Sequence, residues 1–358
     1  MHEQRSQRPR RPATPAARGI VLVLAALTLA ALLNAQGLRK TAQIQPDGAR
    51  RTVAIDVTRV LARVSHALYL DRPRQELLVA IGRRGEDTID ATVHFSLPHA
   101  HVKQPVKKPT VRKPHGHPRK PPRHVPPARP VFTAAKPLRV WVAGDSLAAV
   151  PGQALERLAG AGGAVDVLPV ESRLSTGLGR PDLYNWFTRI EQAAVKLRPN
   201  VAVLSFGADD AHDYMSGVPA GRSIGPLGSA SWNAEYRRRV DGVTRELIAR
   251  GIDVVWLGTP IPRGAGFHRS FEVVNRVIEG VVALHRAHAA YVDEWGLLGY
   301  RHHHYADYLP DSHGHLVLMR APDGVHLEPP AGDLVANAVA NRLDRFFVLR
   351  PRLRHGSA

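Results

Sequence analysis

The chain has 358 residues, 44% of them hydrophobic, so it carries enough apolar side chains for a folded core and is not wholly disordered. Its formal net charge is +18, but residues 1–18 and 98–137 together carry 14 of these charges, which places most of the basic excess outside any core. The absence of cysteine excludes a disulfide framework, a thiolate metal site and a cysteine nucleophile.

The N-terminus has the pattern of a membrane signal. Residues 1–18 are rich in arginine and precede an apolar run over residues 19–38 that has the length of one membrane-spanning helix. The positive-inside rule then predicts a cytoplasmic head and an extracytoplasmic remainder. A cleaved signal peptide is the alternative. Apolar side chains recur at helical spacing from Val57 to Leu68, which predicts a membrane-proximal helical segment within residues 39–97.

Residues 98–137 are rich in proline, lysine, arginine and histidine. This composition cannot bury apolar surface and favours polyproline II, so it predicts a semi-rigid linker between two folded parts. No aromatic side chain accompanies the charges between Pro98 and Pro130 to stack on bases. We therefore expect no nucleic acid as a partner.

From Leu138 onwards, apolar runs alternate with helical patterns, which predicts βαβ units. The expected class is α/β, a three-layer α/β/α sandwich with a five-stranded parallel sheet of flavodoxin-like type, over residues 138–349 with a tail at 350–358. The expected strands are Leu138–Ala143, Val165–Val170, Val201–Phe206, Val254–Leu257 and Ala290–Val292. The expected helices include Gly152–Ala159, Trp186–Leu197, Ser231–Arg250, Glu272–His288 and Gly332–Phe347. In such folds the functional site lies at the carboxyl ends of the strands.

Four short blocks of polar and small residues follow expected strands or precede the last helix. They are Gly144-Asp145-Ser146, Ser175-Thr176-Gly177-Leu178, Gly207-Ala208-Asp209-Asp210 and Asp323-Gly324-Val325-His326. Each block alone also fits an ordinary turn or helix cap. A histidine oriented by a carboxylate can, however, take the proton of a serine nucleophile, so the order of the blocks indicates serine chemistry.

In this order the four blocks resemble the SGNH/GDSL hydrolase superfamily. The segments Ser172–Leu178, Arg180–Asp182, Trp186 and Tyr305–Pro310 are similar to a membrane-anchored bacterial branch of it. The resemblance covers roughly residues 138–349. It implies an SGNH hydrolase-like domain that needs no cofactor.

The resemblance also implies the catalytic roles. Ser146 would be the nucleophile, His326 the general base and Asp323 the residue that orients the histidine. The oxyanion hole would use the backbone N–H of Ser146, the backbone N–H of Gly177 and the side chain of Asp209. For the second of these donors, Gly179 is the alternative.

Asp209 departs from the family pattern, which has asparagine at this position. An ionised carboxylate would repel the oxyanion, and the loss of one donor typically costs ~100- to 1000-fold in turnover. Three explanations for the carboxylate at this position stay open. Asp209 could be protonated beside Asp210 and still donate, His212 could supply the missing donor, or the domain could bind its ligand without catalysis.

We assign four further residues to substrate binding. They are Asp210, Arg173, Thr176 and Trp186, with core packing as the alternative for Trp186 and exposed surface charge as the alternative for Arg173. His302–His304, His313 and His315 lack the spacing of a ligand set, so we expect no metal site.

The resemblance and the expected topology together predict an extracytoplasmic serine esterase or acyltransferase. It would act on O-acyl groups, acetyl above all, of a cell-envelope polysaccharide or another acylated substrate. The alternative is a catalytically weakened domain of the same fold that binds cell-wall glycan.

Overall fold

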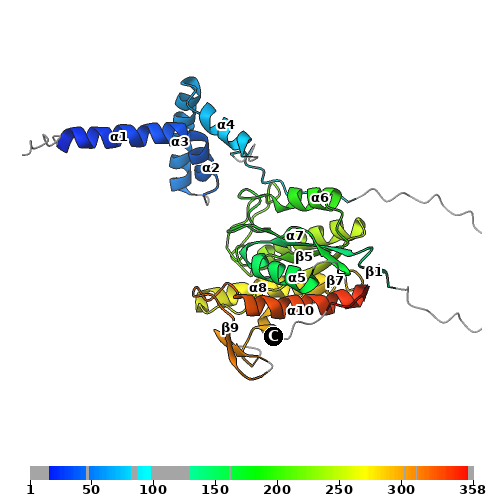
Figure 1. Ribbon diagram of the computed structural model, residues 1–358. Helices are drawn as coiled ribbons and strands as arrows, with labels where there is room; N and C mark the ends of the chain where they lie inside the picture. Colours follow the sequence, from blue (N-terminus) through cyan, green and yellow to red (C-terminus); the bar gives the residue numbers. More distant parts are fainter. Residues whose placement is uncertain are drawn as a thin grey trace, which may run out of the picture. The chain divides into compact units, whose positions relative to one another are not determined.

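The computed structural model divides the chain into two compact units, Met1–Ile89 and Asp90–Ala358 (Figure 1). The residues that it describes are 16–45, 48–81, 85, 87–97, 129–160, 163–301, 304–311 and 313–353. Most of the predicted basic head and most of the predicted linker therefore lie outside the described residues.

The N-terminal unit is helical. Its helices are α1 (Ala16–Leu33), α2 (Ala35–Gln43), α3 (Ala49–Ala67) and α4 (Arg72–Ala80). The apolar side chains of α1 are exposed from Ile20 to Leu29. Among the described helices no single one is long and apolar enough to cross a membrane; α1 from Arg18 and α2 meet that criterion only as a pair, bent by 73°.

The predicted continuous helix over residues 19–38 is thus broken at Asn34, between α1 and α2. Tertiary packing accounts for the bend. Helix α2 packs on α3 and buries Ala35 and Ala42, while the hydroxyl of Ser65 in α3 donates to the carbonyl of Leu32 at 2.7 Å. These contacts turn the chain back onto α3 instead of continuing the axis of α1.

The second unit, here the α/β unit, is built on a parallel sheet. Its strands are β2 (Leu138–Gly144), β3 (Val165–Val167), β4 (Glu171–Ser172), β5 (Val201–Ser205), β6 (Asp253–Leu257) and β7 (Ala289–Val292). The order is β3-β2-β5-β6-β7, with β4 paired to the end of β2, and every pairing is parallel. The α/β class and the parallel sheet are confirmed, but the sheet has six strands. The expected strand Val165–Val170 is shorter than predicted: β3 ends at Val167, two residues before Pro169, which has no N–H for the ladder, and the separate strand β4 begins at Glu171.

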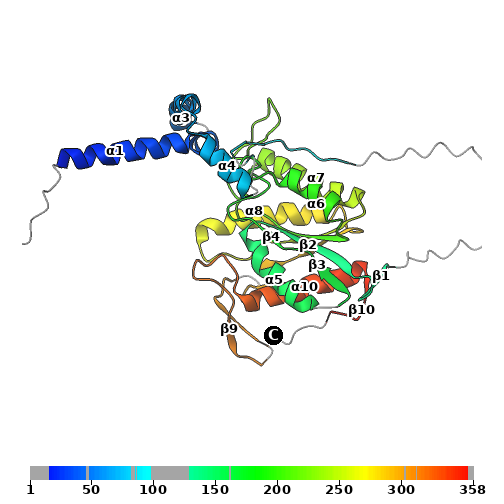
Figure 2. The same ribbon diagram turned by 45° about the horizontal axis from the view of Figure 1, so that its top comes forward.

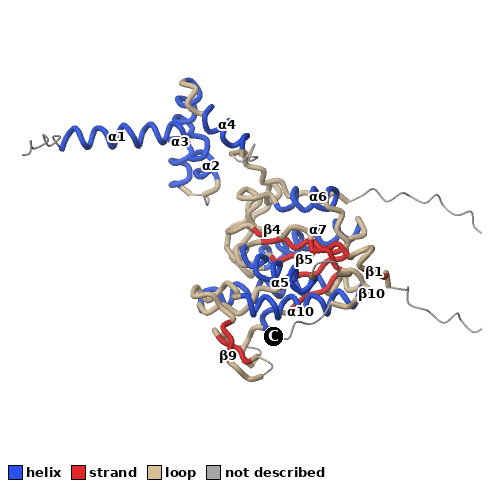
Figure 3. Tube along the Cα trace, in the orientation of Figure 1, coloured by secondary structure: helices blue, strands red, loops and turns tan. Residues whose placement is uncertain are grey.

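Helices cover both faces of this sheet (Figures 2 and 3). Side chains alternate between the faces along each strand, so Trp141 and Ala143 of β2 pack in one core and Val140 and Val142 in the other. The first core includes α6 (Trp186–Lys196), α7 (Ala230–Ala249) and α8 (Ala265–Val282), and the second includes α5 (Ala149–Ala159) and α10 (Pro329–Phe346).

Several elements of the α/β unit have no counterpart among the expected ones. They are β1 (Val131–Thr133) paired in parallel with β10 (Val348–Arg350), the antiparallel pair β8 (Tyr308–Pro310) and β9 (Leu316–Leu318), the 3₁₀ turn η1 (Ser146–Ala148) and α9 (Glu294–Leu297). Strand β1 lies inside the predicted linker 98–137. The α/β unit also includes residues 90–97, which the sequence assigned to the membrane-proximal segment.

The strand order places the switch point of the sheet between β2 and β5. The chain leaves β2 towards α5 on one face, and the helices before and after β5 lie on the other face. Open parallel sheets bind ligands at such a point, beyond the carboxyl ends of the strands. Two of the four sequence blocks begin there, directly after β2 and β5.

Candidate active site

Ser146 follows β2 and opens η1. The carboxylate of Asp145 accepts from the N–H of Leu147 at 2.9 Å and caps this turn. The second oxygen of the same buried carboxyl accepts from Gly207 and Ala208, at 3.1 and 3.3 Å, and so ties the end of β2 to the loop after β5. Burial raises the pKa of Asp145 well above its usual value, and the nearby Asp209 adds to the shift.

The structure brings Ser146, His326 and Asp323 into one hydrogen-bonded chain. Nε2 of His326 lies 2.7 Å from the Ser146 hydroxyl oxygen, and Nδ1 lies 2.5 Å from Oδ2 of Asp323. Partial burial opposes ionisation of Asp323, but hydrogen bonds from the N–H groups of Val325 and His326 and from the imidazole outweigh it and lower its pKa to about 2. An ionised Asp323 accepts from Nδ1–H, which leaves Nε2 to accept the serine proton.

A buried arginine holds the loop that carries Asp323 and His326. Arg320 donates to the carbonyl oxygens of Val325, at 3.2 Å, and Ile261, at 2.8 Å. The sequence did not identify this residue, because an arginine three positions before a loop carries no signal of burial. Its guanidinium fixes the loop against the segment after β6.

The second block forms a turn whose backbone is held by Asp210. The buried carboxylate of Asp210 accepts from the N–H groups of Leu178 and Gly179, at 3.1 and 2.6 Å, and from the hydroxyl of Tyr236 at 2.7 Å. The N–H of Gly179 is therefore engaged, whereas no described residue accepts from the N–H of Gly177. The N–H of Gly177 is therefore the one of the two that stays free to donate to a ligand.

This arrangement corrects the role expected for Asp210. Its side chain is buried beneath the Gly177 turn and offers no surface to a substrate. Burial raises its pKa, against the hydrogen bonds that it accepts. A Cβ on Gly177 would lie 2.0 Å from Oδ1 of Asp210, so only glycine fits above it.

Arg239 of α7 supports the same turn from the other side. It is fully buried and donates to the carbonyl oxygens of Leu178, Gly179 and Ser216 at 2.7 to 3.2 Å, while Glu235 balances its charge at 2.8 Å. In the sequence the Glu235–Arg239 pair is indistinguishable from a solvated i,i+4 pair. The tertiary fold turns this pair towards the site.

Asp209 follows β5 and is half-buried. Burial is the main cause that raises its pKa, the charge of Asp210 adds to it, and His212 and His326 oppose it. No hydrogen bond joins its carboxyl to another described residue. His212 is exposed and close enough to Asp209 to act on it electrostatically.

Two residues expected to bind substrate are buried. Trp186 is fully buried at the start of α6, and its Nε1 donates to the hydroxyl of Thr176 at 2.9 Å. The Thr176 hydroxyl in turn donates to the carbonyl of Arg173 at 2.8 Å. Trp186 and Thr176 therefore support the second block from the core side. Core packing is the alternative that holds for Trp186.

Arg173 lies at the surface beside the same turn. Its guanidinium stacks 4.3 Å from the ring centre of Tyr184 and lies 3.6 Å from the carboxylate of Glu171. Half of its side chain stays exposed. Arg173 is thus accessible to a ligand that approaches the site from solvent.

The histidines considered for metal binding form no ligand set in the described part of the chain. His302 and His303 lie outside it. Among the residues that the structure describes, no group of three or more histidine, aspartate or glutamate side chains is arranged to hold a metal ion.

The parallel sheet, with a serine after β2 and an Asp-x-x-His loop before the last helix, has the arrangement that the resemblance to SGNH/GDSL hydrolases predicts. Residues 139–342 match the family described as "Protein of unknown function (DUF459)", and the chain belongs to this family. A comparison with functionally curated proteins finds no match.

Similar solved structures include enzymes from several bacteria. A lipase/acylhydrolase from Enterococcus faecalis is 16% identical, covers 62% of this chain and 99% of its own, and has a TM-score of 0.42. The M. smegmatis aryl esterase is 11% identical, with 58% and 99% covered and a TM-score of 0.41. The psychrotrophic esterase EstA from Pseudoalteromonas is 13% identical, with 58% and 97% covered and a TM-score of 0.39.

Proposed function

We propose that the α/β unit is a serine esterase or acyltransferase. The observation that carries this proposal is the hydrogen-bonded chain from Ser146 through His326 to Asp323 at the carboxyl ends of the strands. The resemblance of the four sequence blocks to SGNH/GDSL hydrolases supports the proposal, and the particular catalytic roles are part of it.

The mechanism follows from the atoms that this chain aligns. Ser146 Oγ attacks the ester carbonyl carbon while its proton passes to Nε2 of His326, and Asp323 stabilises the imidazolium. The negative oxygen of the tetrahedral intermediate accepts from the N–H groups of Ser146 and Gly177. Collapse breaks the ester C–O bond, and His326 protonates the departing alkoxide. Water or a second hydroxyl group then takes the acyl group from Ser146.

Asp209 acts in this proposal as a protonated acid. While it is protonated, its carboxyl O–H can serve as a third donor where asparagine serves in the family, and burial and Asp210 raise its pKa. As the pH rises through that pKa, the donor is lost and a negative charge replaces it. The reaction therefore slows on the alkaline side.

The proposed substrate is an O-acyl group, acetyl above all, on a cell-envelope polysaccharide. The site is open enough for a polymer, since His326 and Asp323 have side chains that are 41% and 50% exposed. Arg173 lies exposed beside the Gly177 turn and suits an acidic glycan. The exposed apolar surface of α1 and the Arg-rich head support an extracytoplasmic, membrane-held location.

The second candidate is a domain of this fold that binds glycan without cleaving it. The departure from asparagine at position 209 supports this candidate in the case that Asp209 is ionised, because a carboxylate at the oxyanion position would suppress catalysis.

A covalent serine probe separates the two candidates. We expect a fluorophosphonate to label the full-length protein, p-nitrophenyl acetate to be hydrolysed, and Ser146→Ala to abolish both. Absence of labelling and hydrolysis in a correctly folded wild-type protein would refute the esterase proposal and leave the second candidate.

A further inference from the structure

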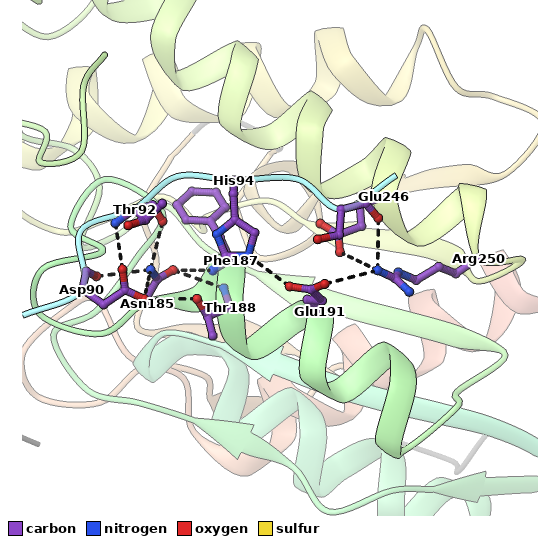
Figure 4. A network of polar contacts seen from close by, with 10 residues as sticks. Asp90, Thr92, His94, Asn185, Phe187, Thr188, Glu191, Glu246 and Arg250 are labelled. Carbon is purple, nitrogen blue, oxygen red and sulfur yellow. Dashed lines mark hydrogen bonds and ion pairs between the residues drawn. The ribbon is translucent and has the colours of Figure 1, made fainter. Parts of the chain in front are cut away.

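The α/β unit begins with an extended segment, Asp90–Leu97, that runs along α6 and α7 (Figure 4). We call this segment the strap. It contains no helix or strand, so it depends on contacts with other elements to hold it in place.

The first half of the strap is bound by the residue that caps α6. Oδ1 of Asn185 accepts from the N–H groups of Phe187 and Thr188, at 3.1 and 3.2 Å. The amide nitrogen of Asn185 donates to the strap, at 2.8 Å to the carboxylate of Asp90 and at 3.2 and 2.9 Å to the carbonyl oxygens of Asp90 and Thr92. One side chain therefore both starts the helix and holds the strap.

Asp90 is ionised in this arrangement. Slight burial opposes ionisation, but hydrogen bonds from Thr92, Asn185 and Thr188 outweigh it and lower the pKa of Asp90. Figure 4 shows the carboxylate between these donors.

The second half of the strap is anchored by Phe95. Its ring packs edge-on against Phe187 with centroids 5.6 Å apart, and the guanidinium of Arg238 lies 5.6 Å from its centre. The ring lies directly over Gly242 of α7, where a Cβ would come within 2.3 Å of it. Any larger residue at position 242 would displace the strap.

Polar contacts flank this aromatic anchor. Nε2 of His94 lies 3.0 Å from the carboxylate of Glu191 in α6, and Arg250 donates to the carbonyl of Ser96 at 3.0 Å (Figure 4). The strap is thus held along its whole length by side chains of two helices.

The start of α6 connects the strap to the Gly177 turn. Trp186, the first residue after the cap Asn185, donates to the hydroxyl of Thr176, and Thr176 adjoins Gly177. A shift of the α6 N-terminus would therefore move the backbone of Gly177, which is the second oxyanion donor in the proposed function.

A second path leads from the strap to the same turn. The carbonyl oxygen of Ala91 packs so closely on Gly217 that a Cβ there would lie 2.1 Å away. The neighbouring Ser216 donates its N–H to the carbonyl of Gly179 at 3.0 Å and accepts from Arg239. Both paths end on residues 176–179.

We propose that the strap positions the Gly177 turn for catalysis, so that the catalytic unit begins at Asp90 and not at Leu138. This inference rests on the proposed function. It also changes the meaning of the Pro-rich segment. The strap ends at Leu97 on α6 and α7, and Val131–Thr133 pairs with β10, so residues 98–128 connect two points of one unit instead of two units.

Asn185→Asp tests the strap directly. Aspartate keeps the oxygen that caps α6 but loses the amide donor and puts a second negative charge beside Asp90. We expect kcat for p-nitrophenyl acetate to fall ~10- to 100-fold with KM within about twofold, because misplacement of a reacting group by 1 Å costs up to ~100-fold. Adding Asp90→Asn returns an amide donor to the pair, and we expect the double variant to recover most of the lost kcat.

The measurements are made on the full-length chain, uncut and after cleavage at a protease site inserted within residues 98–128. Amide exchange at Leu178 and Gly179 reports the turn without any need for activity. We expect cleavage of wild type to leave exchange and kcat unchanged, Asn185→Asp to speed exchange, and the double variant to restore protection.

Two results would overturn the proposal that the strap positions the Gly177 turn. The first is that Asn185→Asp changes neither kcat nor amide exchange at Leu178 and Gly179. The second is that adding Asp90→Asn to Asn185→Asp restores neither quantity. If cleavage of the wild-type chain within residues 98–128 lowers kcat and speeds exchange as Asn185→Asp does, then chain connectivity, and not the contacts of the strap, holds this segment. If exchange follows the expected pattern while no form hydrolyses ester, the proposed function fails and the positioning of the turn stands.

Discussion

Asp209 is the residue at which this chain departs from the pattern it resembles. Its carboxyl group has almost the shape of an asparagine amide but donates a hydrogen bond only when protonated. Burial and Asp210 both raise its pKa, which extends the pH range over which it can donate. In the proposed mechanism the rate at a given pH therefore depends on the charge of this side chain.

Asp209→Asn should change the pH profile of the esterase. Below the raised pKa of Asp209 the wild type keeps a protonated donor, so the two rates should be similar. Above that pKa the wild type carries a negative charge at the oxyanion position and the variant does not, so the variant should be ~10- to 100-fold faster. Rates measured across the pH range test this. A ratio that does not vary with pH would mean that Asp209 points away from the oxyanion.

Glu294 is a second carboxyl with an unusual environment. It is fully buried after β7, and neither oxygen has a hydrogen-bonding partner in the described part of the chain. Burial raises its pKa to about 8, with Asp145 and Asp293 adding to the shift and Arg320 opposing it. In the folded protein Glu294 therefore stays protonated at neutral pH.

Glu294→Gln should flatten the pH dependence of stability. Between pH 4.5 and about 8 the unfolded chain loses the Glu294 proton while the folded chain keeps it, so wild-type stability falls as pH rises, by at most about 1.4 kcal/mol per unit. Glutamine does not titrate. Urea unfolding at pH 5 and pH 8 should show the variant gaining relative to wild type at pH 8. If the free energies of unfolding of the two proteins differ by the same amount at pH 5 and at pH 8, Glu294 does not have a raised pKa in the folded protein.

At the scale of elements, the site depends on short turns held between rigid segments. The turn over residues 175–179 carries no regular structure of its own, yet Asp210, Arg239 and Trp186 reach it from three sides. Preorganised donors of this kind stabilise an oxyanion because they need no reorganisation during the reaction.

Gly177→Ala should disrupt this turn. The added Cβ would lie 2.0 Å from the Asp210 carboxylate, so either the turn or Asp210 must move, and we expect kcat to fall ~100-fold. Gly266→Ala is the matched control, because its Cβ meets no atom within 4 Å on helix α8. Activity and thermal unfolding of both variants distinguish loss of the oxyanion donor from loss of the fold. Wild-type kcat in Gly177→Ala would exclude this turn from the site.

At the scale of the whole molecule, two units of different character share one chain. The N-terminal unit exposes the apolar surface of α1, whereas the α/β unit encloses two hydrophobic cores around its sheet. A contiguous exposed apolar surface needs a membrane or a protein to cover it. Our proposal assigns that cover to the membrane.

Protease added to intact cells tests this location. We expect the α/β unit to be digested while the head over residues 1–18 survives, because the positive-inside rule keeps the head in the cytoplasm. An epitope on each unit reports the outcome. Protection of the α/β unit until the cells are broken would refute the extracytoplasmic location.

The sequence by itself determined the order of the main strands and helices and the blocks that line the switch point. Residue spacing reports local periodicity, and strands followed by polar blocks lead to one edge of a parallel sheet. The roles of Ser146, Asp323 and His326 came from the resemblance of these blocks to SGNH/GDSL hydrolases, before their distances were known. The limits of α8 were less predictable: it begins at Ala265, seven residues before the expected Glu272, and ends at Val282.

Only the tertiary structure decided which polar residues face the substrate and which hold the site from inside. Asp210 and Thr176 stand in the motif blocks but are buried, and so is Trp186, which we had assigned to substrate binding. Arg239 and Arg320 stand outside every block but hold the loops of the site. Burial and choice of partner depend on which distant segments meet, and spacing carries no information about that. The bend at Asn34 and the position of the strap on α6 also depend on such contacts. In both places, contacts between distant segments override the structure that the local composition favours.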